Sequence, residues 1–330
     1  MKLKFNLTEE SASMKTSRRD FLKMSASSFG LAGLTTLPYH VLARPEIIQL
    51  TILHTNDVHS RIEPFPMDGS RNQGLGGVAR RATLINSIRK QQDNVLLLDA
   101  GDIFQGTPYF NLFGGELEMK LMTDMGYDAA TMGNHDFDNG LQGFLKQLPH
   151  AKFPFLTSNY DFSDTILKGK TQDYQVFVKQ GLRIGVFGLG IELEGLVDKK
   201  NYLNTLYLDP LKKANEMSDL LKHDLRCDLI ICLSHLGYKY REQKISDVQL
   251  AALTRNIDLI IGGHTHTFLK QPEDIVNTDG KITTVNQVGF AGINLGRIDY
   301  YFNREKREKS RVARTYPVGP EISETFNSKA

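Results

Sequence analysis

The sequence has few of the features that define several common classes of protein. It contains no tryptophan and only two cysteines in 330 residues, and Cys227 and Cys232 flank or occupy a single apolar run. Cysteines this close in sequence are too near to brace a fold, so we expect buried thiols and no disulfide framework. No apolar run is long enough for a membrane span in the mature protein. Internal repeats and low-complexity segments are also lacking.

The sequence also has no large excess of positive or negative charge, because the formal net charge of the chain is only +2. Residues 1–43 carry six Lys and Arg against three acidic residues, which leaves 34 basic and 35 acidic residues in the remainder. The remainder therefore has no basic footprint for nucleic acid. A hydrophobic content of 40% over this length suits one large α/β domain or two small ones.

The amino terminus has the order of features found in an export signal. Residues 17–23, which include a pair of arginines, resemble the twin-arginine signal of bacteria. A modest apolar region follows over residues 24–37, and residues 41–43 are suited to cleavage by a signal peptidase. We predict a signal peptide over residues 1–43, cleavage after about Ala43, passage through the twin-arginine translocase and a periplasmic location. The alternative is an amphipathic first helix with an accidental arginine pair.

Hydrophobic periodicity predicts alternating strands and helices. Strands are expected at Ile47–Leu53, Asn94–Leu98, Phe153–Leu156, Asp228–Leu233 and Ile257–Ile261, and in an apolar run that ends at Asn134. Helices are expected at Val78–Gln92, Glu116–Met125, Leu141–Leu148, Pro210–Leu225 and Val248–Leu253. A hairpin is expected within Asp173–Gly190, antiparallel strands within Ile282–Phe302, and a charged, solvent-facing stretch over Arg304–Arg314.

Five apolar runs end, at the carboxyl side, in residues that commonly bind metals. These residues are Asp57 and His59, Asp102, Asn134 and His135, His235, and His264 and His266. In open α/β sheets ligands gather beyond the carboxyl ends of the strands, so we expect these side chains to meet in one place. The remaining histidines of the mature chain, His54, His150 and His223, are expected to be structural.

The stretch Thr131–Asp138 sets an amide, an imidazole and two carboxylates in one turn. Asn134 offers a neutral oxygen ligand, and Asp138 lies three residues after His135, near enough to fix its tautomer. Taken alone, this stretch also fits a surface turn after a strand, because Asn, Asp and Gly are turn formers. The four other strand ends favour the metal site.

In these five blocks the sequence resembles the calcineurin-like dinuclear metallophosphoesterases, and within them the 5'-nucleotidase group. The matching blocks are Asp57-Val58-His59, Gly101-Asp102, Gly133 to Asp138, Ser234-His235 and Gly262 to His266. The resemblance implies an α/β fold, a four-layer αββα sandwich of two mixed sheets flanked by helices, as a catalytic domain over residues 44–330. It also implies site roles: Asp57, His59 and His266 hold one metal, Asn134, His235 and His264 hold the other, Asp102 bridges the two, and His135 and Asp138 form the catalytic dyad.

The chemistry of phosphate-ester hydrolysis suits such a set. Two cations about 3.5–4 Å apart need a shared carboxylate, and they lower the pKa of a bridging water toward about 7, which gives a hydroxide aimed at phosphorus. Imidazole and oxygen ligands suit manganese, zinc, iron or cobalt and do not choose among them. His135, which is not needed as a ligand, is free to assist the leaving group while Asp138 favours its charged form.

Substrate contacts are predicted at Asn134, His135 and Arg61, although Arg61 also fits a solvated basic loop residue. The predicted substrates are phosphate monoesters, above all 5'-nucleotides or related nucleotide esters. Full-length 5'-nucleotidases carry a second domain whose aromatic residues clamp the base. Here the sequence stops at Ala330, soon after the last predicted strands, so we expect either a looser substrate range or a separate clamping chain.

Two other functions remain open from the sequence. One is a sulfur-ester hydrolase of the thiosulfohydrolase type, which resembles the same family. The other is a metal-carrying binding subunit that has lost catalysis. The presence of both His135 and Asp138 beside a full ligand set argues against the second, because a binding role has no use for the dyad.

Overall fold

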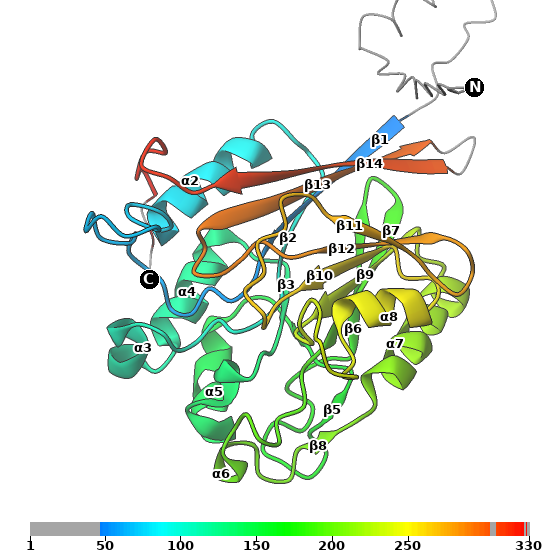
Figure 1. Ribbon diagram of the computed structural model, residues 1–330, viewed down its shortest axis with the longest axis horizontal. Coiled ribbons are helices and arrows are strands. Elements are labelled where there is room, and N and C mark those ends of the chain that lie inside the picture. The colour runs from blue at the N-terminus through cyan, green and yellow to red at the C-terminus, as the bar shows by residue number, and fades with distance from the viewer. Residues whose placement is uncertain (1–46, 304–307, 327, 329–330) are drawn as a thin grey trace, which may run out of the picture. The chain divides into compact units, whose positions relative to one another are not determined.

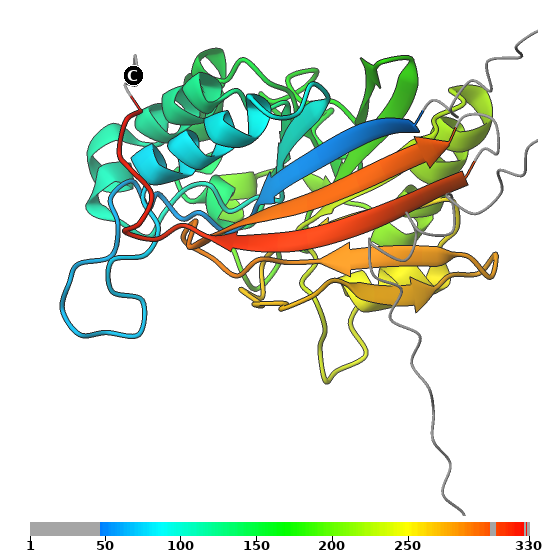
Figure 2. The same ribbon diagram turned by 90° about the horizontal axis from the view of Figure 1, so that it is seen from above.

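The computed structural model describes residues 47–303, 308–326 and 328. The predicted signal peptide, residues 1–43, lies outside these residues. The described residues form two six-stranded sheets whose facing surfaces share one hydrophobic core, with helices on the two outer faces (Figures 1 and 2). The predicted α/β architecture of two mixed sheets flanked by helices is confirmed.

The first sheet has the strand order β14-β13-β1-β2-β3-β4. Its strands are β1 (Ile47–Thr55), β2 (Val95–Asp99), β3 (Ala129–Thr131), β4 (Phe155–Leu156), β13 (Asn294–Asn303) and β14 (Glu308–Pro317). Strands β1 to β4 run parallel, whereas β13 pairs antiparallel with both β1 and β14. The carboxyl ends of β1, β2 and β3 therefore lie at the same edge of the sheet.

The second sheet has the strand order β11-β12-β10-β9-β7-β6. Its strands are β6 (Tyr174–Lys179), β7 (Leu182–Leu189), β9 (Leu229–Ser234), β10 (Leu259–Gly262), β11 (Glu273–Val276) and β12 (Ile282–Asn286). The four central strands are parallel and the two edge strands are antiparallel. A separate two-stranded ribbon joins β5 (Tyr160–Asp161) to β8 (Leu206–Tyr207).

Helices cover the outer face of each sheet. The first sheet is covered by α2 (Val78–Arg89), α4 (Glu116–Met125) and α5 (Gly140–Gln147), and the second by α7 (Pro210–Asp219) and α8 (Asp247–Leu253). Two shorter helices, α3 (Pro108–Phe113) and α6 (Lys199–Tyr202), lie in connecting segments, and a π-helical turn over Leu220–Asp224 extends α7. No helix among the described residues is long and apolar enough to cross a membrane.

The two-residue period of the strands explains the layers. In β2, Leu96 and Leu98 enter the core between the sheets, whereas Val95 and Leu97 pack under the helices. In β9, Leu229, Ile231 and Leu233 face the inner core while Ile230 and Cys232 face α7 and α8. These strands are apolar on both faces because both faces are buried. Cys227 and Cys232 are buried free thiols, as predicted.

Two segments differ from what their sequences predict. The segment Ile282–Phe302 does contain two strands, but β12 and β13 belong to different sheets and do not pair with each other. The predicted charged stretch Arg304–Arg314 overlaps β14, an edge strand whose alternating residues partly face solvent. Charged side chains are common on edge strands because they oppose pairing with other chains, and this composition hid the strand.

Candidate metal centre

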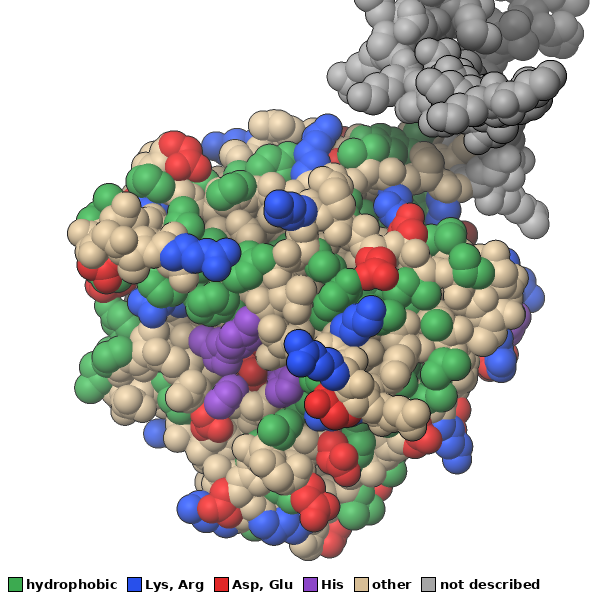
Figure 3. Space-filling model, viewed as in Figure 1, with side chains coloured by type: hydrophobic (Ala, Val, Ile, Leu, Met, Phe, Trp, Pro, Cys, Tyr) green, Lys and Arg blue, Asp and Glu red, His purple; other side chains and the backbone are tan. Residues whose placement is uncertain are grey.

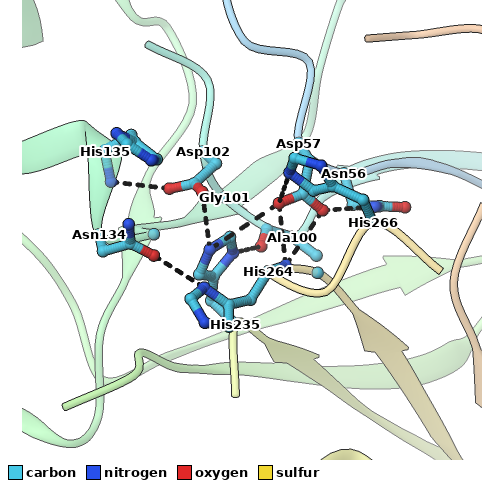
Figure 4. A network of polar contacts seen from close by, with 12 residues as sticks. Asn56, Asp57, Ala100, Gly101, Asp102, Asn134, His135, His235, His264 and His266 are labelled. Carbon is cyan, nitrogen blue, oxygen red and sulfur yellow. Dashed lines mark hydrogen bonds and ion pairs between the residues drawn. The ribbon is translucent and has the colours of Figure 1, made fainter. Parts of the chain in front are cut away.

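The carboxyl ends of five parallel strands, three from the first sheet and two from the second, converge on one cluster of polar side chains (Figure 4). The turns after β1, β2 and β3 present Asp57, Asp102 and Asn134, and the turns after β9 and β10 present His235 and His264. The predicted convergence of strand ends is therefore observed, although the ends belong to two facing sheets and not to one.

One group of ligand-type atoms consists of Asp57, His59 and His266, whose nearest nitrogen and oxygen atoms all lie within 4.8 Å of one another. The Nε2 atoms of His59 and His266 are 2.9 Å apart, and His266 Nε2 is 3.5 Å from Asp57 Oδ1. Asp57 is fully buried, whereas the His266 side chain is 41% exposed. This group therefore opens toward solvent on the side of His266.

The second group consists of Asp102, His235 and His264, again with ligand atoms within 4.8 Å of one another. His264 Nδ1 lies 2.8 Å from the side-chain oxygen of Asn134, which adds an amide oxygen to the group. His235 is fully buried, and its Nδ1 lies 2.7 Å from the carbonyl oxygen of Ala100. That contact makes Nδ1 the protonated nitrogen of a neutral His235 and leaves the lone pair on Nε2.

Asp102 stands between the two groups. Its Oδ2 lies 3.1 Å from His235 Nε2 and 3.8 Å from His59 Nε2, so the same oxygen faces a histidine of each group. Asp57 links the groups on the other side, because its Oδ1 is 3.9 Å from His235 Nε2 and accepts a hydrogen bond from the backbone N–H of His264. The two groups thus form one continuous site.

The atoms of His235 and Asp102 fit a bound cation. His235 Nε2 has no hydrogen-bond partner among the described residues although it is buried. Its lone pair and the Asp102 carboxylate, only 3.1 Å away, would repel each other unless a proton or a metal ion lies near both. Because the ligand set contains imidazole, carboxylate and amide oxygen and no thiolate, it suits divalent manganese, iron, cobalt or zinc.

The electrostatics of the site also favour a cation. Burial opposes protonation of His235, but the carboxylates of Asp102 and Asp57 outweigh it and raise the pKa of His235 to about 10. Burial lowers the pKa of His264 to about 4, so this imidazole keeps its lone pairs at neutral pH. The same carboxylates would favour a metal ion at His235 in place of that proton, because metal binding requires the deprotonated imidazole.

Backbone conformation marks the same residues. Asp57, His59, Asp102, His264 and His266 all have positive φ, between 49° and 70°, which is unfavourable for residues with a Cβ. Such strain persists only where the surrounding structure imposes it, and it concentrates at functional sites. Five of the seven predicted ligands are held in this conformation, and all five belong to the two groups of ligand-type atoms.

Close packing of glycine backbone makes room for the cluster. A Cβ on Gly101 would lie 2.6 Å from the backbone nitrogen of Gly133, and a Cβ on Gly263 would lie 2.8 Å from His235 Nδ1. The turns after β2, β3 and β10 can approach one another and His235 only because these positions lack side chains.

His135 and Asp138 lie beside the candidate ligand atoms and not among them. His135 Nδ1 is 2.9 Å from Asp138 Oδ2, and the His135 ring lies edge-on to His59 with centroids 5.3 Å apart. The hydrogen bond to Asp138 raises the pKa of His135 above its ordinary value. The backbone N–H of His135 also donates to Asp102 Oδ1, at 2.8 Å, which fixes the imidazole relative to that carboxylate.

Arg61 is placed differently from the other predicted site residues. Its guanidinium stacks over the ring of Phe65, with 4.1 Å from Cζ to the ring centroid. The structure therefore brings Arg61 to an aromatic side chain near the site, while the seven predicted ligands meet one another directly. His54, predicted to be structural, is buried and accepts a hydrogen bond from Asn286 at 2.9 Å.

Three supporting residues were not assigned from the sequence. Buried Asp136 accepts backbone N–H bonds from Gly133, Asp102, Ile103 and Phe104, and so ties the turn after β2 to the turn after β3. Asn56 bonds the loop after β12 through Gly289 and Val288. Gln287 from that loop bonds Gly263 and Thr267 on either side of His264 and His266. Asp136 was visible within the motif, but nothing in the sequence marked Gln287.

Comparison with known proteins supplies a family for this arrangement. Residues 50–268 match the family model described as calcineurin-like phosphoesterase. The chain is 34% identical to the snake venom 5'-nucleotidase of Gloydius brevicauda over 308 residues, which cover 86% of this chain and 50% of the relative. The chain thus spans about half the length of the curated relatives that it matches.

Solved structures give the same result. The 5'-nucleotidase precursor of Thermus thermophilus superposes with a TM-score of 0.76 at 32% identity, covering 84% of this chain and 56% of that one. The NAD nucleotidase of Haemophilus influenzae superposes with a TM-score of 0.70 at 29% identity, covering 82% of this chain and 50% of that one. Both likenesses extend over most of the described residues.

Proposed function

The chain belongs to the calcineurin-like phosphoesterase family, and from this premise we propose that it is a metal-dependent hydrolase of phosphate monoesters that acts chiefly on 5'-nucleotides. One observation carries the proposal. His235 Nε2 and Asp102 Oδ2, both buried, lie 3.1 Å apart, and Nε2 has no hydrogen-bond partner among the described residues, within a site that two groups of ligand atoms share. The snake venom and Thermus relatives, both described as 5'-nucleotidases, support the substrate class.

In this proposal, each group of ligand atoms would hold one divalent cation. Asp57, His59 and His266 would hold one, Asn134, His235 and His264 would hold the other, and Asp102 would contribute to both because its Oδ2 faces both His59 and His235. Divalent cations supply charge that offsets the phosphate and activates water as the nucleophile. The protein keeps the ligands in place through strained turns and buried hydrogen bonds.

His135 is proposed as the group that assists the leaving oxygen. Because Asp138 fixes Nδ1, the other ring nitrogen, Nε2, is the atom free to donate a proton or a hydrogen bond. Asp138 acts through His135 by orienting the ring and favouring its charged form. Asn134 adjoins the same turn and is proposed to contact the phosphoryl group as well as a metal, and Arg61 is proposed as an additional cation for the substrate.

Export belongs to the same proposal. A signal peptide at residues 1–43 would direct the folded protein through the twin-arginine translocase to the periplasm, so that the cations could be acquired before export. The translocase and a separate nucleotide-clamping chain remain predicted partners.

The test is turnover by protein that begins at residue 44. Metal analysis comes first, followed by assays of phosphate release from nucleoside monophosphates, a cyclic diester, a nucleotide sugar and an aryl phosphate. The proposal predicts release from nucleoside monophosphates that chelation abolishes and divalent metal restores. Metal-dependent hydrolysis of a thiosulfonate with no action on any phosphate ester would instead support the sulfur-ester hydrolase.

A further inference from the structure

Aromatic rings extend outward from the metal-binding group at His266. The ring of Phe290 stacks on the His266 imidazole, with centroids 5.1 Å apart and an angle of 14° between the planes. Phe268 and Phe65 both meet Phe290 edge to face, at centroid distances of 5.8 and 6.5 Å. We call Phe65, Phe268 and Phe290 the aromatic platform.

The backbone holds the platform in register with the metal ligands. Residue Phe290 lies between two hydrogen bonds to the turn after β1, because Gly289 O accepts from Asn56 and Ala291 N donates to Asp57 O. Phe268 lies two residues after His266, and its ring packs against Gly289, where a Cβ would overlap it. The position of the platform is therefore fixed by the same turns that position Asp57 and His266.

The platform is also open to solvent. Phe268 is 42% exposed, and Phe65 and Phe290 are partly exposed. Figure 3 shows the histidines gathered in a hollow, with hydrophobic side chains adjoining them on the same face. Single exposed apolar residues are common on protein surfaces, but contacting aromatic rings that continue from a polar site are typical of ligand recognition.

We propose that the aromatic platform binds the planar ring of the leaving group, a nucleobase, while the phosphate lies at the metal centre. Phe268 supplies the most exposed of the three rings, and Phe290 contacts both that ring and His266. Stacking suits any base because every base has a π face, so this site selects for nucleotides over simple sugar phosphates and not for one base. The inference rests on the proposed function and assigns its substrate preference to residues of this domain.

Two substrates with the same ester group separate ring binding from chemistry. Adenosine 5'-monophosphate and ribose 5-phosphate both present a primary phosphate ester on ribose, and only the first has a base. We expect Phe268→Ala to lower kcat/KM for adenosine 5'-monophosphate by about tenfold, the usual effect of one base–aromatic stack. The value for ribose 5-phosphate is expected to stay within about twofold of the wild type, because the variant leaves the metal ligands in place. Phe113→Ala, an exposed phenylalanine outside the platform, is the matched control and changes neither value.

An equal loss for both substrates would show that Phe268 only supports His266. No loss for either substrate would show that the base does not reach the platform. Each of these results would overturn the proposal.

A second readout does not depend on catalysis. Because the chain has no tryptophan, Phe268→Trp introduces a single indole whose emission reports on stacking. Adenosine 5'-monophosphate is expected to quench the indole emission, and ribose 5-phosphate is expected to leave it unchanged. Absence of quenching, or equal quenching by both compounds, would contradict base binding at the platform. Wild-type turnover of ribose 5-phosphate tests the proposed function separately.

Discussion

His135 and Asp138 form a hydrogen-bonded pair within a single turn, with 2.9 Å between Nδ1 and Oδ2. The pair flanks the candidate ligand atoms, and the His135 side chain is 38% exposed. Neither residue belongs to the two groups of candidate ligand atoms. Loss of the imidazole should therefore affect proton transfer and leave metal binding intact.

The variant His135→Ala tests this separation of roles. We expect it to retain the metal content of the wild type while turnover falls about 10²–10⁴-fold, the usual contribution of a positioned proton donor. This corresponds to roughly 3–5 kcal/mol of transition-state stabilisation. Metal analysis and kcat, measured on the same preparation, show whether activity is lost without loss of metal. A variant that loses metal in proportion to activity would place His135 among the ligands.

Gln287 is expected to matter for metal affinity although it is remote from the motifs. Its fully buried side chain accepts from Thr267 N and donates to Gly263 O, so it holds both ends of the turn that carries His264 and His266. Replacement by leucine, Gln287→Leu, removes both bonds, and we expect metal affinity to fall about 10- to 100-fold. Isothermal titration calorimetry with Mn²⁺ measures this affinity, and Gln91→Leu, at an exposed position, is the control. Unchanged affinity in Gln287→Leu would disprove this positioning role.

His54 predicts a specific loss of stability in acid. Burial lowers the pKa of His54 to about 3, whereas the unfolded imidazole titrates near 6.5. As the pH falls below about 6.5, the unfolded chain takes up a proton that the folded chain refuses, so stability is lost progressively down to about pH 3. At pH 4.5 this amounts to about 3 kcal/mol.

Urea unfolding of the wild type and of His54→Gln, at pH 7.5 and 4.5, isolates that contribution. Other groups titrate in both proteins, so their effects cancel in the comparison. The wild type should lose about 3 kcal/mol more than the variant between the two pH values. The same pH dependence in both proteins would mean that His54 does not resist protonation in the folded state.

The strands, and the gathering of ligand-type residues beyond their carboxyl ends, could be predicted from the sequence because both depend on local pattern, whereas the four layers and the metal roles of the ligands were implied by the family resemblance. The strands β2 and β9 are apolar at successive positions because both of their faces are buried. The turns that follow them carry the predicted ligands Asp102 and His235. The helix α4 was predicted with its observed bounds, Glu116–Met125, because its apolar face has helical spacing and a glycine follows it.

The supporting contacts could not be predicted in this way, because they are set by tertiary structure. Gln287 and Asn56 are ordinary polar residues in sequence, and only the packing of the loop after β12 against the turns after β1 and β10 gives them partners. The same holds for Phe290, which meets His266 across 24 positions of sequence. The short α3 and the edge strand β11 were also missed, since neither has enough residues for a clear period.

We propose that Asp102 would be a ligand to both cations, and metal analysis of Asp102→Ala is the direct test. His135→Ala serves as the matched control, since it alters the neighbouring turn without removing a proposed ligand, and circular dichroism checks that both variants are folded. We expect folded Asp102→Ala to retain neither ion after dialysis, and His135→Ala to retain two per chain. Two ions still bound to Asp102→Ala would contradict the shared carboxylate and the dinuclear site built on it.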